Sequence, residues 1–440
     1  MSVAIDDYQL LRQNQVPAEI SDLVDLAVAV HVADRISIRQ EDFPCQIHIV
    51  LPVRHPEIFE RPQIAEYLRD NLYWYTGDYW LFEFRHRTAH GRRAELQRCI
   101  FPKNSTDEFI EVALWSGGLD SLAGLFTQLL SKSGKSYTLF GTGSNTIIHH
   151  TQQQTAQAIR EKIFGCTKLI QVPIKPDETT DLPKNSSQHS RGFVFLLLGA
   201  ACARAEKQSS LHIYENGIGA INLPFRASEV GLDHTRSVHP LSLLKMSELV
   251  SRLLDVSFTF NNPFLLWTKA QMCESLIQAN AIDLIFDTIT CDHLHREKPM
   301  QCGLCSSCLL RRQALAVLGI EDKTRYVSTH GTHSPSLNDT HLQAMLYQVN
   351  KLKSILDEAD PWRALSRRYP QLSDIVDQTA TQYTATPEEM KKELLQLYGR
   401  YVREWDSVQH LVGREFFHCQ KNGRLSDVTT NYQQEQMVWS

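Results

Sequence analysis

Apolar residues recur with different periods in different parts of the chain, and each period predicts a type of element. The pattern changes twice, which divides the chain into regions of residues 1–108, 109–327 and 328–440. The first region mixes a helical period with strand-like alternation, the second alternates strands with helices, and the third is helical. We therefore expect three structural units.

The first region is predicted to form a small α+β extension. A helical pattern covers residues 21–35, and strand-like alternation follows at 45–53 and 79–87. The unit ends at residues 102–108, a polar stretch with the composition of a linker.

In the second region, short apolar stretches alternate with amphipathic helical ones. Strands are expected at residues 112–115, 137–141, 168–174 and 211–216, and helices at 120–130, 151–164 and 193–205. Because parallel strands need long crossover connections, this alternation predicts βαβ units. The fold class is therefore α/β, with a doubly wound parallel sheet.

The third region is predicted to be a helical extension. Apolar residues follow helical spacing in two stripes, within residues 342–356 and 390–405. Residues 386–389, Thr-Pro-Glu-Glu, read as an N-cap, a proline at the first helical position and a capping box. We interpret both stripes as packing surfaces.

Composition and charge favour a globular protein that binds neither membranes nor nucleic acid. The chain has 440 residues and is 42% hydrophobic, as expected for globular material. Its longest apolar stretch, residues 193–203, is roughly half the length of a membrane-spanning helix. The N-terminal residues are acidic where a secretory signal would be basic, so we expect a cytoplasmic protein without a membrane partner. The net charge of −5 argues against nucleic acid as a partner.

Residues 116–121, Ser-Gly-Gly-Leu-Asp-Ser, lie at the predicted turn from the first strand of the sheet into a helix. Such a turn presents free backbone N–H groups and the positive end of a helix dipole, which favour a phosphate. Gly117 and Gly118 let the backbone approach a phosphate closely, and the hydroxyls of Ser116 and Ser121 add hydrogen bonds. Asp120 would repel phosphate unless magnesium lies between them, so this segment, the SGGLDS loop, predicts a site for ATP with Mg²⁺.

Four of the ten cysteines fall within 18 residues, in the spacing C-x10-C-x2-C-x2-C: Cys291, Cys302, Cys305 and Cys308. In a reducing compartment, clustered thiols favour a metal site over disulfides. Four thiolates fill the tetrahedral shell of zinc, so we expect a structural Zn²⁺ site. Two alternatives remain open: His293 or His295 could replace one cysteine as ligand, and the cysteine pairs could have a redox role.

The SGGLDS loop resembles the pyrophosphate-binding loop (PP-loop) of the N-type ATP pyrophosphatases. Residues 261–272, with an Asn-Pro-x4-Thr-Lys pattern, follow it, and the four-cysteine motif comes next. Over residues 110–327 this order is similar to that of the QueC family, the 7-cyano-7-deazaguanine synthases. The resemblance implies an adenine nucleotide alpha hydrolase-like fold. It also implies a reaction in which ATP activates the carboxylate of 7-carboxy-7-deazaguanine, ammonia forms an amide, and the amide is dehydrated to a nitrile.

The resemblance also implies roles for individual residues. The SGGLDS loop would bind pyrophosphate, Lys269 would balance charge on the phosphates, and Arg191 would hold a phosphate or the carboxylate of the base. Gly141, at the end of the second strand of the sheet, would mark the place of adenine and ribose. Lys269 and Arg191 could instead be surface residues at helix starts. The segment after Gly141, Thr-Gly-Ser-Asn, departs from the family pattern and weakens the nucleoside assignment.

Glu215, Asn216 and Gly217 end a predicted strand on the same side of the sheet as the SGGLDS loop. They are our candidates for contacts to the deazapurine, and ordinary turn chemistry at Asn216-Gly217 is the alternative. The surrounding stretch, residues 214–240, differs from the substrate loop of QueC.

The two extensions around a QueC-like core resemble the QueC-like proteins of bacterial anti-phage defence systems, such as QatC. This resemblance implies a changed acceptor, the N-terminal amine of a partner protein in place of ammonia. Three alternatives stay open: ordinary nitrile synthesis, tRNA modification, and a non-catalytic nucleotide-binding scaffold.

Overall fold

The computed structural model describes residues 3–5, 10, 17–39, 44–88, 110–131, 135–143, 145–163, 167–176, 185, 189–225, 236–292, 300–327 and 340–412. The predicted linker at residues 102–108 and the histidines at 293 and 295 lie outside these ranges.

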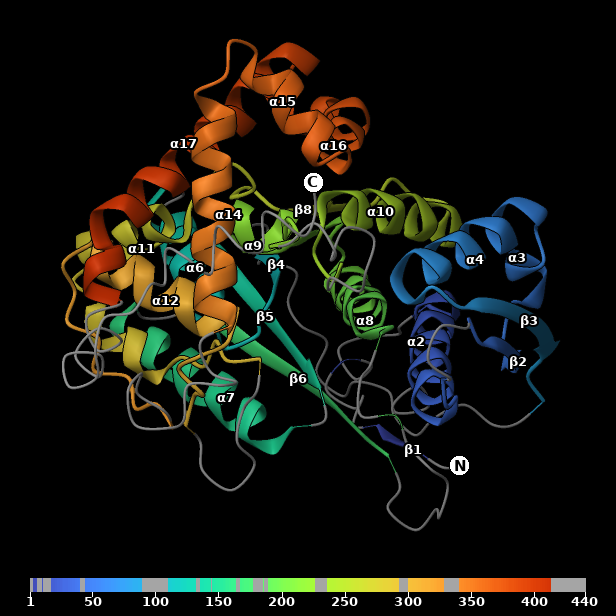
Figure 1. Ribbon diagram of the computed structural model, residues 1–440. Helices are drawn as coiled ribbons and strands as arrows, with labels where there is room; N and C mark the ends of the chain where they lie inside the picture. Colours follow the sequence, from blue (N-terminus) through green and yellow to red (C-terminus); the bar gives the residue numbers. More distant parts are fainter. Residues whose placement is uncertain are drawn as a thin grey trace.

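The centre of the molecule is a sheet of five parallel strands (Figure 1). They are β4 (Ile110–Leu114), β5 (Ser136–Gly143), β6 (Thr167–Pro176), β7 (Ser210–His212) and β8 (Thr259–Asn261). The spatial order is β6-β5-β4-β7-β8, so the order reverses between β4 and β7. This confirms an α/β fold with a parallel sheet, and the strand order is compatible with a Rossmann-like fold.

Helices cover both faces of this sheet (Figure 1). One face carries α6 (Leu119–Ser131), α7 (Thr146–Lys162) and α11 (Lys269–Gln278), and the other carries α8 (Arg191–Ala205) and α10 (Pro240–Leu254). Along β4, Val112 packs into the core on the α8 side and Ala113 into the core on the α6 side. Successive strand residues point to opposite faces, so both faces of β4 are buried, as in other parallel sheets.

The N-terminal region contains the predicted α+β elements. Helix α2 (Ala18–Ile36) precedes β2 (Gln46–Val53), the short α3 (Pro56–Phe59), α4 (Pro62–Thr76) and β3 (Tyr79–His86). Strands β2 and β3 pair in parallel, and alternate residues of β2 are buried, as its sequence pattern predicts.

This region is joined to the central sheet by shared packing and by one strand. Side chains of α2 and α4 belong to the same hydrophobic core as those of α8 and α10. The short strand β1 (Val3–Ile5) pairs antiparallel with β6 and extends the central sheet by one strand. The N-terminal residues therefore contribute to the core that the sequence pattern assigns to the second region.

The C-terminal region is helical, as predicted. It comprises α14 (Thr340–Leu356), α15 (Pro361–Arg368), α16 (Gln371–Thr379), the 3-10 turn η3 (Ala380–Tyr383) and α17 (Pro387–Val412). Both apolar stripes are packing surfaces: they meet each other and residues of α9 (Gly217–Ile221), α10 and α12 (Ser306–Val317) in a second core. Helix α17 thus lies against the central domain along much of its length (Figure 1).

Two sequence predictions need correction in their extent. The strand expected at residues 211–216 ends at His212, because Ile213–Asn216 leave the ladder and lead into α9. The helix expected to start at residue 151 starts at Thr146, where the side chain of Asn145 caps it. Among the described residues, no helix combines the length and apolar character that crossing a bilayer requires.

Candidate functional site

The SGGLDS loop connects β4 to α6 at the point where the strand order reverses. The N–H of Trp115 still bonds to the carbonyl of Phe140 at 2.7 Å, and the chain then turns. The hydroxyls of Ser116 and Ser121 lie 2.9 Å apart, and the N–H of Gly118 donates to Ser116 Oγ at 3.1 Å. These bonds tie the loop to the first turn of α6, whose N–H groups have no acceptor within the helix.

Gly117 is the residue that allows this turn. Its φ of +74° lies in the left-handed region, which a residue with a side chain enters only at an energetic cost. A Cβ at this position would also lie 3.2 Å from the backbone nitrogen of Gln152. The loop can therefore pack against α7 only with glycine here.

Asp120 is the centre of a buried polar group beside the loop. It is 6% exposed, and Lys269, 4% exposed, forms an ion pair with its Oδ2. Asn216 donates to the other oxygen, Oδ1, at 2.9 Å, and the same amide nitrogen lies 2.9 Å from Glu215 Oε1. Residues 96 and 149 positions beyond Asp120 in the sequence therefore meet at its carboxylate.

The charges of this group shift each other's protonation. Burial alone would lower the pKa of Lys269, but the neighbouring Asp120 and Glu215 outweigh it and raise that pKa. Glu215 is partly accessible, yet burial and the negative charge of Asp120 raise its pKa to about 8. The raised pKa keeps Lys269 in its charged ammonium form, and Glu215 is a carboxyl group that can exchange a proton near neutral pH.

Helix caps hold Lys269 and Asn216 in place. Lys269 is the first residue of α11, and Thr268 and Gln271 form a capping box around it, which we name the α11 cap. Asn216 is the N-cap of α9 and accepts from the N–H of Gly219 at 3.0 Å. Both side chains therefore start from rigid backbone.

Gly217 is buried by close packing. A Cβ there would lie 1.9 Å from the carbonyl oxygen of Leu265 and 2.7 Å from Leu397 of α17. Its N–H donates to the carbonyl of Trp267 at 2.8 Å. The structure thus gives Gly217 a role in joining the Asn216 turn to the segment before Lys269.

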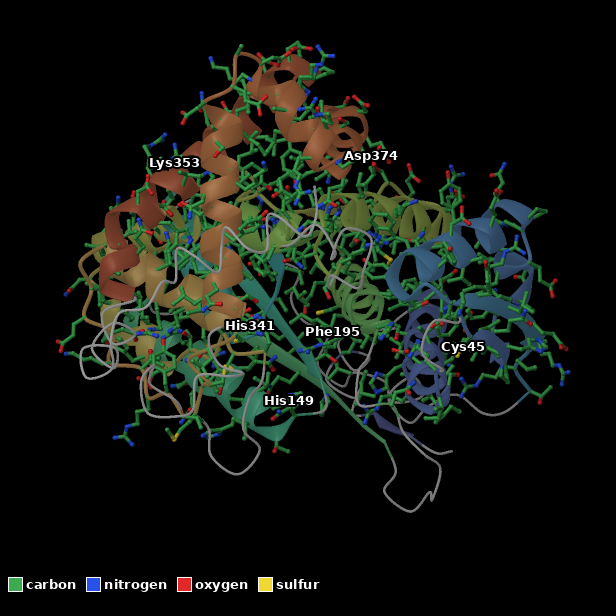
Figure 2. All side chains as sticks on the ribbon, viewed as in Figure 1. Cys45, His149, Phe195, His341, Lys353 and Asp374 are labelled. Carbon is green, nitrogen blue, oxygen red and sulfur yellow. The ribbon has the colours of Figure 1, made fainter. Side chains whose placement is uncertain are left out.

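Two further predicted site residues lie apart from the Asp120 group. Arg191 starts α8, is exposed, and stacks on the ring of Phe195, labelled in Figure 2, at 5.0 Å. Surrounding protein lowers the pKa of its guanidinium, and Asp292 opposes that shift. Within the described ranges, no hydrogen bond or ion pair joins Arg191 to Asp120. Gly141 is buried in β5, beside the side chain of Gln152.

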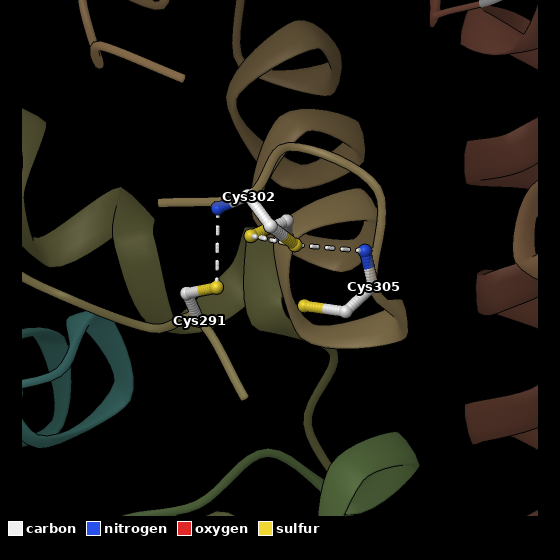
Figure 3. Close-up of side chains that lie close together, drawn as sticks. Cys291, Cys302 and Cys305 are labelled. Carbon is white, nitrogen blue, oxygen red and sulfur yellow. Dashed lines mark hydrogen bonds between the residues drawn. The ribbon is translucent and has the colours of Figure 1, made fainter. Parts of the chain in front are cut away.

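The four clustered cysteines meet at the start of α12 (Figure 3). All four Sγ atoms lie within 4.8 Å of one another. The Sγ of Cys291 accepts from the N–H of Cys302 at 3.2 Å, and the Sγ of Cys302 accepts from the N–H of Cys305 at 3.3 Å. Such N–H···S bonds stabilise thiolates.

This cluster fits a tetrahedral metal. With Zn–S bonds of about 2.3 Å, neighbouring sulfurs of a tetrahedron lie about 3.8 Å apart. The Sγ atoms of Cys302 and Cys308 lie 3.9 Å apart. The predicted metal centre is therefore compatible with zinc, held by four thiolates without an open position.

The cysteine cluster is linked to the SGGLDS loop through the chain before Cys291. The N–H of Ile289 donates to the carbonyl of Gly117 at 3.2 Å. The fully buried Arg311 of α12 holds the same segment, donating to Thr288 Oγ1 at 2.6 Å and to the carbonyl of Ile285 at 2.7 Å. A metal that orders α12 would therefore also order the support of the loop.

Sequence reasoning missed two buried polar residues near the site. Gln152 packs between Gly117 and Gly141, and Glu404 of α17 contacts the α11 cap. Each residue lies on the buried side of its helix, where the helical period predicts an apolar residue. A polar residue at such a position was the sequence signal for both.

The arrangement places N–H groups, hydroxyls, an ammonium and carboxyl groups at the carboxyl edge of adjacent parallel strands. This is where open α/β sheets bind ligands. No protein-family model matches the chain, and no curated protein matches it. The assignment of function therefore depends on the chemistry of the site.

Proposed function

We propose that this protein is a QueC-like ATP pyrophosphatase of the PP-loop class. It would adenylate the carboxylate of 7-carboxy-7-deazaguanine, release pyrophosphate, and couple the acid to an amine. The observation that carries the proposal is the meeting of Asp120, Lys269 and Asn216 beside the SGGLDS loop. The order of motifs in the sequence supports the choice of substrate.

The reaction has two bond-forming steps. A carboxylate oxygen attacks the α-phosphorus of ATP, the bond from that phosphorus to the bridging oxygen breaks, and pyrophosphate leaves. The amine nitrogen then attacks the carbonyl carbon of the acyl adenylate, AMP leaves with the bond electrons, and the nitrogen loses a proton. Adenylation is needed because a carboxylate is a poor electrophile with no good leaving group.

The loop and Lys269 would bind the leaving pyrophosphate. N–H groups of the first turn of α6 and the hydroxyls of Ser116 and Ser121 surround the place for an anion. The Asp120–Lys269 pair would exchange partners when Mg-ATP binds, with Lys269 turning to the phosphates and Asp120 to the ion. Magnesium bound there would neutralise phosphate charge.

The remaining residues would place the two substrates. Gly141 would mark the adenosine side, Arg191 would bind a phosphate or the acid, and Glu215 and Asn216 would contact the deazapurine. The four-cysteine site would hold a structural zinc that supports the loop.

The acceptor would be the N-terminal amine of a partner protein, in a cytoplasmic anti-phage defence system. The extensions support this choice because both pack on the central domain, and α17 of the C-terminal extension reaches the α11 cap. An adenylate reacts with any correctly placed neutral amine, so the change of acceptor needs no new chemistry.

The test combines zinc-loaded protein, ATP, 7-carboxy-7-deazaguanine and candidate proteins encoded beside its gene. Intact mass spectrometry is expected to show one acceptor heavier by the deazaguanine acyl group, with pyrophosphate and AMP released together. An Asp120→Asn variant should lose both products. Release of ADP alone, or of nothing, would overturn the proposal, and free nitrile formed from ammonia would indicate ordinary QueC activity.

A further inference from the structure

Helix α17 reaches the segment that carries Lys269. Glu404 of α17 is 9% exposed, and its Oε1 accepts a hydrogen bond from Thr268 Oγ1 at 2.5 Å. Its other oxygen accepts from Gln313 of α12 at 3.0 Å. This carboxylate therefore joins the C-terminal helix to α11 and to the helix that follows Cys305.

The contact acts on the α11 cap itself. Thr268 Oγ1 accepts from the N–H of Gln271 at 3.3 Å, and Gln271 Oε1 accepts from the N–H of Thr268 at 3.0 Å. Because the Thr268 hydroxyl donates its hydrogen to Glu404, its lone pairs are left to accept the hydrogen bond from the N–H of Gln271. Arg400, one turn earlier in α17, donates to Gln271 Oε1. Both halves of the capping box are thus bound from α17.

The charge and burial of Glu404 suit a positioning role. Burial raises its pKa, and the hydrogen bonds from Thr268 and Gln313 and the charge of Arg400 oppose that shift. A carboxyl group near the N-terminus of α11 is also favoured by the helix dipole. A buried carboxyl group without hydrogen-bond partners would destabilise the fold. A carboxyl group within an apolar stripe therefore needs specific partners.

We propose that Glu404 and Arg400 are positioning residues that fix the α11 cap, and with it the ammonium of Lys269 against Asp120. Helix α17 is then part of the catalytic apparatus as well as a packing element. Leu397 supports the same conclusion, because it packs on Gly217, next to the Asn216 that binds Asp120. The catalytic part of this inference rests on the proposed function.

The test compares four full-length variants with the parent protein. Glu404→Ala removes both acceptor oxygens. Glu404→Gln keeps an acceptor oxygen for Thr268, and Gln313 can turn its amide so that its oxygen accepts from the new NH2 group. Arg400→Ala weakens the cap without emptying a buried site. Asp406→Asn, in the same helix but exposed and paired with Lys353 of α14 (Figure 2), is the matched control.

Pyrophosphate release should fall roughly tenfold to a hundredfold in Glu404→Ala, mainly in kcat, because small displacements of a catalytic group are costly. Glu404→Gln should recover most of this loss, Arg400→Ala should lie between, and Asp406→Asn should match the parent. In the same samples without nucleotide, amide hydrogen exchange at residues 269–272 should be faster in Glu404→Ala and Arg400→Ala alone.

The two measurements separate the possible failures. The positioning role is overturned if Glu404→Ala and Arg400→Ala exchange the amide hydrogens of residues 269–272 as slowly as the parent. It is also overturned if exchange is faster in these variants but kcat matches that of the parent. If the parent itself releases no pyrophosphate, the proposed function fails, and hydrogen exchange alone then decides whether α17 fixes the cap. If Glu404→Ala does not fold, Arg400→Ala provides both readouts.

Discussion

At the residue scale, the site depends on a few charges that are buried together. The resemblance to a known family implied that Asp120 and Lys269 act at one site, and the structure brings the two side chains into contact. The contact of Asn216 with Asp120 depends on where β7 ends, which no local pattern specifies. A polar residue in an apolar stripe marks Glu404, but the stripe does not identify its partner Thr268, which is 136 positions away in sequence.

The raised pKa of Glu215 makes a stability prediction with a definite sign. The folded protein keeps Glu215 protonated up to about pH 8, whereas an unfolded chain ionises it near 4.5. Folding therefore takes up a proton between these values, so the contribution of Glu215 is fully present below about pH 4.5 and is lost as pH rises through about 8.

Urea unfolding of the parent and of Glu215→Gln across this pH range measures the effect. The difference in unfolding free energy, parent minus variant, should fall as the pH rises, because the variant has no proton to lose. A difference independent of pH would contradict the raised pKa.

At the element scale, long amphipathic elements were predicted well and short ones were not. Helix α6 is long enough to show its helical period, and β5 is long enough to be recognised as a strand that is buried on both faces. Strands β1 and β8 have three residues each, too few for alternation to be recognised, and only pairing with β6 and β7 defines them. Whether the SGGLDS loop is a PP-loop stays a prediction.

The cysteine cluster gives a prediction at this scale. Cys302→Ser should remove a thiolate that accepts two backbone N–H bonds, and with it most of the bound zinc. Loss of a structural metal is among the few changes that cost roughly 4 kcal/mol or more. Zinc content by atomic emission and the melting temperature should both fall.

Cys45→Ser serves as the control, since Cys45 lies in the N-terminal region (Figure 2) and is not one of the four clustered cysteines. It should keep the zinc content and the melting temperature of the parent. If Cys302→Ser retains one zinc per chain, the assignment of the metal ligands is wrong.

At the scale of the whole molecule, the order of regions was predictable, and their mutual packing was not. Amphipathic stripes show that a helix has an apolar face, but they do not identify the partner of that face. The structure shows that α2 packs on α8 and that the stripe of α17 packs on α12 and α14. The three regions share cores, whereas the sequence pattern suggested separate units.

A substitution at Asp34 tests whether the N-terminal region and the central domain unfold together. It is fully buried in α2, accepts from the N–H and hydroxyl of Ser190 at 2.9 and 2.7 Å, and pairs with Arg39. Asp34→Ala should lower the free energy of unfolding by about 3–5 kcal/mol, because it leaves buried donor groups without their acceptor. Calorimetry should show one transition, shifted as a whole to lower temperature. A second transition unchanged from the parent would show instead that the N-terminal region unfolds independently.

The bond between Thr268 and Glu404 also affects how the protein is made. Synthesis proceeds from the N-terminus, and earlier segments begin to fold while later ones are still inside the ribosome. The helix cap beside Lys269 gains its last hydrogen bonds only after Glu404, 136 positions beyond Thr268, has emerged. In a nascent chain the α11 cap therefore stays incomplete while the residues between Thr268 and Glu404 are being synthesised.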